Sequence, residues 1–327
     1  MLPSYLSWPV LITAIPTVGF FGFSLFTTPI AVILGFVPLF IVMPVLLWID
    51  RAEPEPRSAK IHTFFWGMSV AGFISVVINT TVALTLGEVA AAVASAPIVE
   101  ESTKALGIVW MVRRKEVDGP IDGIVYAGWS ALGFAMIENV TFFQQAILQD
   151  MLIQTFVVRA LLTPFAHPLF TLWTGLAIGL AVRNRKSTWT ALWGLGVAIA
   201  LHAAWNGSLT IGETDGGAVV ILITLVLFVA LFAAVAIGLQ LLNKRDMERY
   251  RKLIPFLASR YNMSHEQVAL LLDRKALSQA RARTPNKADA QSLMMRASAM
   301  SRLAALFDHD DNPDASDEAR LVAKLGG

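Results

Sequence analysis

The chain has 327 residues, of which 55% are hydrophobic and only 15% are charged, and its mean hydropathy is +0.60. Soluble domains carry about 25% charged residues, so this composition excludes an ordinary water-soluble protein and indicates a chain embedded in lipid. Cysteine is absent, which excludes thiol catalysis, disulfides and cysteine-ligated metals. The formal net charge is only +2, and we expect no nucleic-acid partner.

Long apolar stretches recur along the first three quarters of the chain. A helix needs about 20 residues to cross about 30 Å of hydrocarbon. The first stretch has no basic leader and no cleavage site, so we interpret it as a retained span rather than a signal peptide. The sequence therefore predicts an all-α, polytopic membrane protein with about eight transmembrane helices. These are residues 6–26, 29–49, 62–83, 88–111, 123–146, 160–182, 188–209 and 218–242.

Basic residues mark every second loop. Clusters of Lys and Arg follow the second, fourth, sixth and eighth predicted spans, at residues 51–60, 113–115, 183–186 and 244–252. The loops between them carry almost none. Because basic loops stay on the cytoplasmic side, this pattern predicts a plasma (inner) membrane protein with both termini in the cytoplasm. Arg159 is the exception, and we expect it at the outer interface of the sixth span.

The last 85 residues differ in composition, since they hold 15 of the 26 Lys and Arg residues. A capping box beginning at Ser264 opens one amphipathic helix, and residues 293–307 form a second. The acidic stretch from Asp308 to Glu318 is predicted to be disordered. We therefore divide the chain into a transmembrane domain, residues 1–242, and a cytoplasmic, partly helical and partly disordered tail, residues 243–327. The transmembrane domain has a motif-bearing core at about 88–210.

Ionisable side chains inside the apolar stretches are costly to insert and by default indicate a functional site. They are confined to the fourth to seventh predicted spans. With the orientation above, Glu100 lies about 18 Å below the outer surface, and Glu138, His167 and His202 lie about 10–12 Å below it. The sequence thus predicts one site in the outer half of the membrane. Its members are Glu100, Glu101, Glu138, His167 and His202, accompanied by Lys104.

Helical spacing predicts which of these side chains share a face. Lys104 lies four residues after Glu100 and three after Glu101, so it can pair with either carboxylate. A stripe of polar or small residues at four-residue steps would let a neighbouring helix approach closely. It consists of His167, Thr171, Gly175 and Gly179.

Such a set of side chains permits hydrolysis in two ways. Two histidines and a carboxylate from three helices can hold a zinc-like ion and leave a position for water, while another glutamate acts as general base. Without a metal, adjacent glutamates could activate water directly, with His and Asn donating to the oxyanion. Each residue also has a structural interpretation: Glu100 and Lys104 could form a buried ion pair, and Asn206 could join two helices. The residues leave these alternatives open.

Four motifs in order resemble those of a known family. They are Glu100-Glu101-Ser-Thr-Lys104, Phe134-Ala-Met-Ile-Glu138, the single His167, and His202-Ala-Ala-Trp-Asn206. Together they resemble the PrsW family of intramembrane proteases, which belongs with the type II CAAX prenyl endopeptidases. The resemblance covers about residues 90–210, and the tail lies outside it.

The resemblance implies a role for each matching residue. Glu100 and Glu101 would include the glutamate that activates water. Glu138, His167 and His202 would complete the site, by metal ligation or by stabilising the transition state, and Asn206 would donate a hydrogen bond. The implied activity is an intramembrane peptidase, of the metalloprotease or the glutamate type, that cleaves membrane-tethered proteins. Zinc would be the cofactor of the metal-dependent alternative, and regulated proteolysis of an anti-sigma factor is the implied context.

Two alternatives compete with this interpretation. Buried Glu, His and Lys also build the proton relays of transporters, although a transporter more often shows paired halves with broken helices. A scaffold that keeps the fold without the activity is the other. Signatures of other membrane proteases are missing from the spans, since they contain no His-Glu-x-x-His, Gly-x-Ser-Gly or Gly-x-Gly-Asp. For the tail we expect a cytoplasmic partner.

Overall fold

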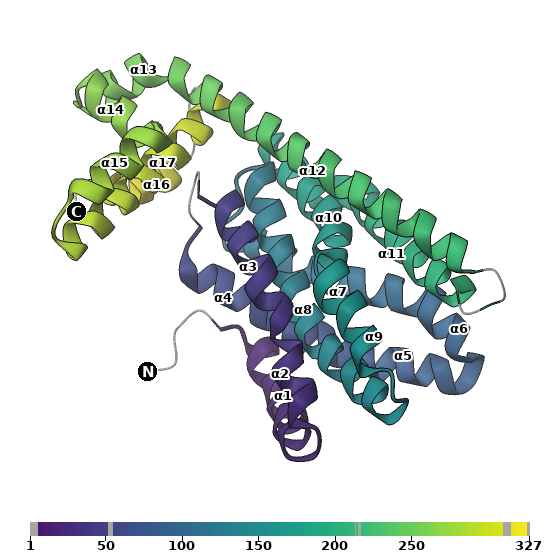
Figure 1. Ribbon diagram of the computed structural model, residues 1–327. Coiled ribbons are helices and arrows are strands. Elements are labelled where there is room, and N and C mark those ends of the chain that lie inside the picture. Colours follow the sequence, from purple (N-terminus) through teal and green to yellow (C-terminus); the bar gives the residue numbers. More distant parts are fainter. Residues whose placement is uncertain (1–5, 52–54, 213, 215–216, 310–314, 326–327) are drawn as a thin grey trace. The chain divides into compact units, whose positions relative to one another are not determined.

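The computed structural model describes residues 6–51, 55–212, 214, 217–309 and 315–325, and within these ranges the regular structure is entirely helical (Figure 1). The all-α prediction is confirmed for this part of the chain. The chain divides into two compact units, Met1–Ile49 with Pro56–Ala234, and Asp50–Glu55 with Val235–Gly327. The boundary therefore falls inside the helix Ala218–Lys252, eight residues before the predicted one, and the second unit also includes residues 50–55.

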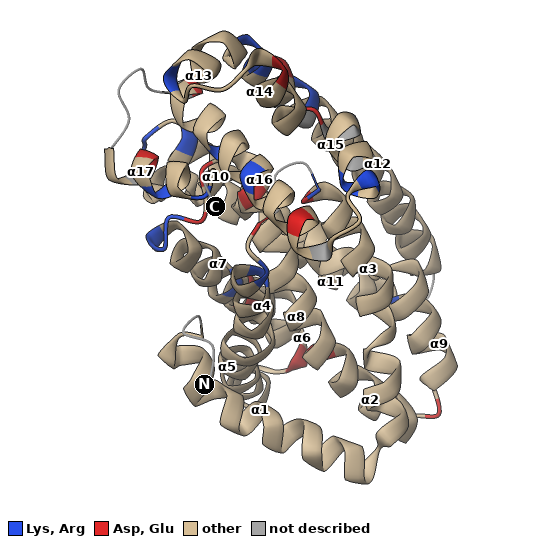
Figure 2. Ribbon diagram, turned by 90° about the vertical axis from the view of Figure 1, so that its left-hand side faces the viewer, with Lys and Arg blue, Asp and Glu red and all other residues tan. Residues whose placement is uncertain are grey.

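The first unit is built from helices that are often interrupted by short π-helical or 3-10 segments. In chain order they are α1 Trp8–Thr27, α2 Pro29–Gly35, α3 Val37–Ile49, α4 Arg57–Phe65, η1 Trp66–Ala71, α5 Gly72–Leu86, α6 Glu88–Ala90, η2 Ala91–Ser95, α7 Ala96–Arg113, α8 Pro120–Leu148, α9 Leu152–Phe156, η3 Val157–Leu162, α10 Ala166–Arg183, η4 Thr188–Ala191, α11 Leu192–Gly212 and α12 Ala218–Lys252. Helices α1 and α2 contain no charged residue, and their ribbons are uniformly tan in Figure 2.

Six helical stretches are long and apolar enough to cross a membrane: Trp8–Thr27, Pro29–Ile49, Arg57–Leu86, Pro120–Leu148, Leu152–Arg183 and Ala218–Lys252. They correspond to six of the eight predicted spans. The other two predicted spans are also helical, at residues 88–113 and 188–212. The first contains Glu100, Glu101 and Lys104 and the second contains His202 and Asn206, so the residues of the predicted site make these two helices less apolar. The count of eight stays a prediction.

The sixth predicted span is divided by a break. The π-helix η3 ends at Leu162, and the helix resumes at Ala166. Thr163 precedes Pro164, and a residue before proline is disfavoured in the helical conformation, which explains the interruption. As a result, His167 lies in the first turn of α10, on a separate helix from Arg159.

Helix α8 is the buried centre of the first unit, and 94% of its most apolar segment is enclosed by other residues. Its closest neighbour is α10. A Cβ added to Gly123 would lie 2.1 Å from the carbonyl oxygen of Gly175, and one added to Gly179 would lie 2.3 Å from that of Gly119. No side chain fits at these positions, so the predicted stripe of small residues does allow the two helices to touch through their backbones. This contact places His167 and Thr171 beside α8.

The second unit contains the end of α12 and the helices α13 Ile254–Arg260, α14 His265–Leu272, α15 Arg274–Arg283, α16 Lys287–His309 and α17 Ala315–Ala323. It has a core of its own, in which Leu257, Met300 and Leu303 are completely buried. The predicted capping box is confirmed: the Ser264 hydroxyl accepts from the backbone of Gln267 at 3.1 Å, and the Gln267 side chain accepts from the Ser264 backbone at 3.0 Å.

Two further features of the second unit concern its charges. Arg302 donates to Glu55 at 2.6 Å, and both side chains are buried, so this ion pair joins α16 to the loop Asp50–Glu55. Of the acidic stretch predicted to be disordered, residues 310–314 lie outside the described part of the chain. Asp308 belongs instead to α16 and residues 315–318 to α17, so these residues are helical.

Candidate active site

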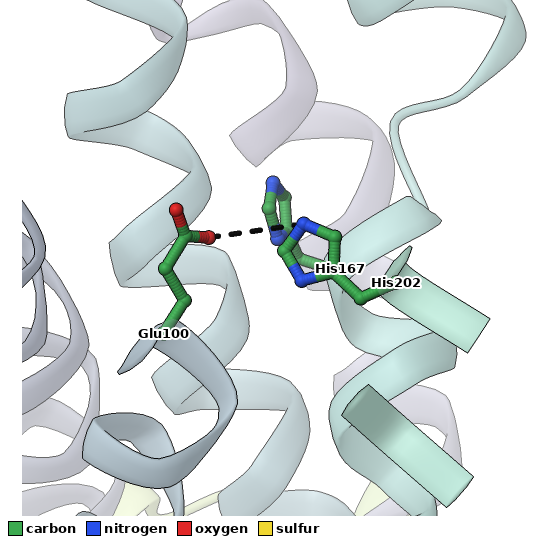
Figure 3. A group of neighbouring side chains, drawn as sticks. All are labelled: Glu100, His167 and His202. Atoms are coloured by element: carbon green, nitrogen blue, oxygen red, sulfur yellow. Dashed lines mark ion pairs between the residues drawn. The ribbon is translucent and has the colours of Figure 1, made fainter. Parts of the chain in front are cut away.

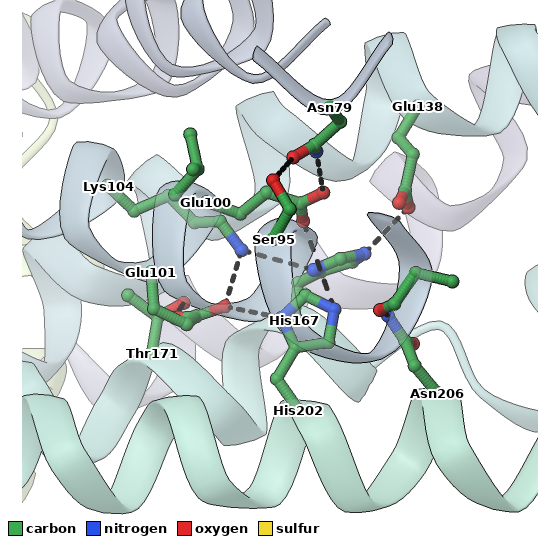
Figure 4. A network of polar contacts seen from close by, with 12 residues as sticks. Asn79, Ser95, Glu100, Glu101, Lys104, Glu138, His167, Thr171, His202 and Asn206 are labelled. Carbon is green, nitrogen blue, oxygen red and sulfur yellow. Dashed lines mark hydrogen bonds and ion pairs between the residues drawn. The ribbon is translucent and has the colours of Figure 1, made fainter. Parts of the chain in front are cut away.

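The predicted site residues come from four helices and form one connected polar network (Figure 4). Helix α7 supplies Glu100, Glu101 and Lys104, and α8 supplies Glu138. His167 comes from α10 and His202 from α11. Residues separated by as many as 101 positions are in direct hydrogen-bond contact. The structure therefore brings together the five side chains that the sequence predicted to share a layer, and Lys104 lies with them.

Glu101 is completely enclosed, and its carboxylate is fully engaged. Its Oε1 accepts from Lys104 Nζ at 2.6 Å and lies 3.1 Å from His202 Nδ1. Its Oε2 accepts from Thr171 Oγ1 at 2.7 Å. Of the two partners that spacing allows, Lys104 takes Glu101 in this structure. With these bonds in place, Glu101 orients His202 so that the opposite ring nitrogen, Nε2, faces the interior of the site.

Glu100 differs from Glu101 because only one of its two carboxylate oxygens has a hydrogen-bond partner among the described residues. Oε1 accepts from Asn79 Nδ2 at 3.2 Å, and Ser95 in turn donates to Asn79 Oδ1 at 2.8 Å. Oε2 is buried and has no hydrogen-bond partner within the described residues. It lies 3.8 Å from His202 Nε2, and Figure 3 shows the carboxylate directed toward the two imidazole rings. Asn79, on α5, is a site neighbour that the sequence prediction missed, because an uncharged amide in an apolar span gives a weak signal.

His167 links the two ends of the network. Its Nδ1 lies 3.2 Å from Lys104 Nζ, and its Nε2 lies 2.7 Å from Glu138 Oε2. Because a lysine ammonium can only donate, Nδ1 accepts and Nε2 carries the proton that it donates to Glu138. Phe134 packs against His167 and Lys104, with its ring centre 5.3 Å from that of His167 and 4.3 Å from Lys104 Nζ. Phe134 and Glu138 are four residues apart and so lie on one face of α8, from which both contact His167.

Arg159 is part of this network, which the sequence did not indicate, and its place at the outer membrane interface stays a prediction. Its guanidinium pairs with the Glu138 carboxylate, donates from Nε to Asn139 Oδ1 at 2.8 Å, and lies 3.8 Å from the Phe142 ring centre. The side chains of Arg159 and Glu138 are 18% and 20% exposed, whereas those of Glu101 and Lys104 are completely buried. The Arg159 end is therefore the accessible end of the site.

Asn206 has a more peripheral place than predicted. Its side chain donates to the backbone carbonyl of Ala92 at 2.8 Å, which ties α11 to η2. This contact is of the helix-joining kind that was one of the two interpretations of this residue. Its role as a hydrogen-bond donor in the reaction stays a prediction.

Three of the buried side chains are grouped closely enough to hold a metal ion. One ligand atom from each of Glu100, His167 and His202 lies within 4.8 Å of the others (Figure 3). The sequence suggested Glu138 as the carboxylate of this set. In the structure Glu138 is already paired with the Arg159 cation and with His167, which makes it a poorer ligand than Glu100 with its unoccupied Oε2.

The donor chemistry of this group fits a divalent ion. Imidazole nitrogen and carboxylate oxygen are ligands that zinc accepts, and three protein ligands leave a position for water. Glu101 holds the far nitrogen of His202, the arrangement that commonly fixes a metal-binding histidine. The network contains three carboxylates but only two permanent cations, Lys104 and Arg159, and neither cation forms an ion pair with Glu100. A divalent cation would compensate this excess negative charge.

The fold and the site together define a helical membrane protein that encloses a carboxylate–histidine cluster among its helices. The family described as "PrsW family intramembrane metalloprotease" matches residues 55–235, more than half of the chain and all of the network. The chain therefore belongs to the PrsW family.

Two curated relatives agree with this assignment. The chain is 32% identical over 144 residues to Protease PrsW of Geobacillus kaustophilus (strain HTA426), which covers 42% of this chain and 61% of that protein. It is 28% identical over 154 residues to Protease PrsW of Clostridioides difficile (strain 630), which covers 43% of this chain and 63% of that protein. The chain thus spans about three fifths of the length of these relatives. No solved structure matches it.

Proposed function

We propose that the protein is a metal-dependent intramembrane peptidase that hydrolyses peptide bonds of membrane-tethered proteins. The observation that carries this proposal is the unpartnered Oε2 of Glu100, buried beside two histidines in a member of a metalloprotease family. Glu100, His167 and His202 would hold the ion, which we take to be zinc, and His167 would use Nδ1 in place of its contact with Lys104. Bound there, zinc would supply polarisation of the scissile carbonyl and a more acidic water.

The remaining side chains orient these groups or move protons. Glu101 holds His202, and Lys104 neutralises Glu101 within the buried interior. Glu138 is the accessible carboxylate of the network, so we assign it the role of general base. It would take a proton from the attacking water and return it to the leaving amine as the carbon–nitrogen bond breaks. The substrate carbonyl carbon gains the water oxygen, which yields a free carboxylate and an amine.

A transporter is the less favoured alternative. Glu, His and Lys do form a continuous chain here, as in a proton relay. However, this network includes a carboxylate oxygen without a hydrogen-bond partner beside two histidines, which is better suited to bind an ion. The family match is also to proteases.

A direct test is cleavage of a single-span reporter protein by the purified protein in liposomes. We expect two fragments whose new ends lie near the membrane surface, and no fragments with the double variant His167→Ala/His202→Ala. The matched control is Gln144→Leu, which removes a polar contact of α8 with Ser24 and Thr28 away from the site. An unchanged fragment yield with the double histidine variant would refute the proposal.

The predicted orientation places the site toward the outer side of the plasma membrane, which suits a substrate cut near its external end, such as a membrane-bound anti-sigma factor. Because the chain has no cysteine, single substitutions report the orientation directly. Gln149 and Lys186 are exposed in consecutive loops. We expect an impermeant thiol reagent to label Gln149→Cys in intact cells and Lys186→Cys only after permeabilisation. The reverse pattern would contradict the orientation. A cytoplasmic partner of the tail also stays a prediction.

A further inference from the structure

Arg159 is the one permanent cation at the accessible end of the network, and its guanidinium is engaged through Nε, Nη2 and its flat face. It pairs with Glu138, donates to Asn139 and covers the ring of Phe142. These three residues lie next to one another on α8, so Arg159 is fixed against a single patch of that helix.

The Glu138 carboxylate that pairs with Arg159 also contacts His167. The same carboxylate oxygen, Oε2, accepts from Arg159 Nη2 and lies 2.7 Å from His167 Nε2. A carboxylate held from one side by an arginine has little freedom to rotate. Arg159 therefore determines where the acceptor for His167 lies, and it acts on the histidine through Glu138.

The backbone leaves His167 dependent on this side-chain contact. The helical run is broken between Leu162 and Ala166, so η3 and α10 are not one rigid rod. The α9–η3 segment faces outward for most of its length, with Ile153 76% and Leu162 55% exposed, and Ala160 is its one buried residue. Arg159 is the polar anchor that connects this segment to the site.

We propose that Arg159 is a positioning residue, which holds Glu138 against His167 and thereby fixes the imidazole for metal binding and Glu138 for proton transfer. This inference rests on the proposed function for its catalytic part. Its structural part, the fixed tautomer of His167, does not. Arginine is suited to the role because its planar guanidinium presents donors in a fixed geometry, with Nε on Asn139 and Nη2 on Glu138.

The structural part is tested by nitrogen NMR of the metal-free protein labelled at histidine, with His167→Gln used to assign the signal among the five histidines. We expect the wild type to show one tautomer of His167, protonated at Nε2. Arg159→Met is expected to lose this single state, and Arg159→Lys to recover part of it. Gln144→Leu is the matched control on α8 and should resemble the wild type. An unchanged His167 signal in Arg159→Met would overturn the proposal.

The functional part is tested by metal titration and by steady-state cleavage with the same variants. Loss of an outer partner of a metal-binding histidine typically weakens metal affinity or activity by about 10–100-fold. We expect Arg159→Met to lose this much metal affinity and kcat, with KM changed by less than about threefold, and Arg159→Lys to lie between it and the wild type. Wild-type metal affinity and kcat in Arg159→Met would overturn the inference. Failure of the wild type to bind metal or to cleave would instead refute the proposed function and leave the NMR comparison decisive for Arg159.

Discussion

Replacing Glu100 by alanine is expected to abolish cleavage while leaving the protein folded. The Oε2 atom of this carboxylate makes no hydrogen bond, and Oε1 has one, from Asn79. Little stability is therefore lost with the side chain. Catalysis should fall by at least about 10²–10³-fold, the effect of removing one preorganised group from a reacting centre. The measurements are reporter cleavage and metal content of the purified variant.

The matched control for Glu100→Ala is Glu88→Ala, which removes an exposed glutamate from the same helical run. This control should cleave at the wild-type rate. Loss of both activity and bound metal in Glu100→Ala would identify Glu100 as a ligand. Loss of activity with the metal retained would instead make Glu100 the water-activating base. Wild-type turnover by Glu100→Ala would contradict both roles.

Replacing Lys104 by methionine is expected to have the largest effect on stability. Lys104 and Glu101 are both completely buried, with 2.6 Å between Nζ and Oε1. Removing one partner of a buried ion pair leaves an uncompensated charge and destabilises a protein by about 3–5 kcal/mol. Unfolding by denaturant in a mild detergent should show this loss. The variant Arg251→Met, which removes an exposed pair with Asp273, should lose less than about 1 kcal/mol.

A double variant separates the charge from the rest of the Lys104 effect. Glu101→Gln combined with Lys104→Met removes both charges, and replacing a whole buried pair by neutral groups is often tolerated. We expect the double variant to recover most of the lost stability. It should stay inactive, because His202 then lacks the carboxylate that orients it. A Lys104→Met protein as stable as the wild type would show that the pair is not an essential part of the interior.

Much of the fold could be predicted from the sequence, since apolar length determines which segments enter lipid. Six of the predicted spans are confirmed as helices able to cross a membrane. The stripe that includes Gly175 and Gly179 was correctly predicted to allow close packing, because a four-residue step defines one helix face. The capping box at Ser264 was predictable for the same reason, as its partners are only three residues apart.

Contacts between helices could not be predicted in this way. Spacing along α7 allowed Lys104 to pair with Glu100 or Glu101, and only the packing of His167 and Thr171 against α7 shows that the pair is with Glu101. The partners of Arg159 could not be predicted either, because loop charges report topology and not the partner of a particular side chain.

Which carboxylate lies beside the two histidines also depends on contacts between helices. The sequence suggested Glu138, and the structure groups Glu100 with His167 and His202. The difference arises because Arg159, from another helix, already neutralises Glu138. Asn79 had only a weak signal in the sequence, since a single amide in an apolar span is usually a contact between helices.

Restoration of cleavage by metal is the measurement that tests the central claim most directly. The purified protein would be stripped with a chelator, shown by elemental analysis to be free of metal, and titrated with zinc while reporter cleavage is followed. We predict no cleavage by the stripped protein and full recovery at about one zinc per chain, with no recovery in His202→Ala. Undiminished cleavage by protein verified to contain no metal would contradict the account.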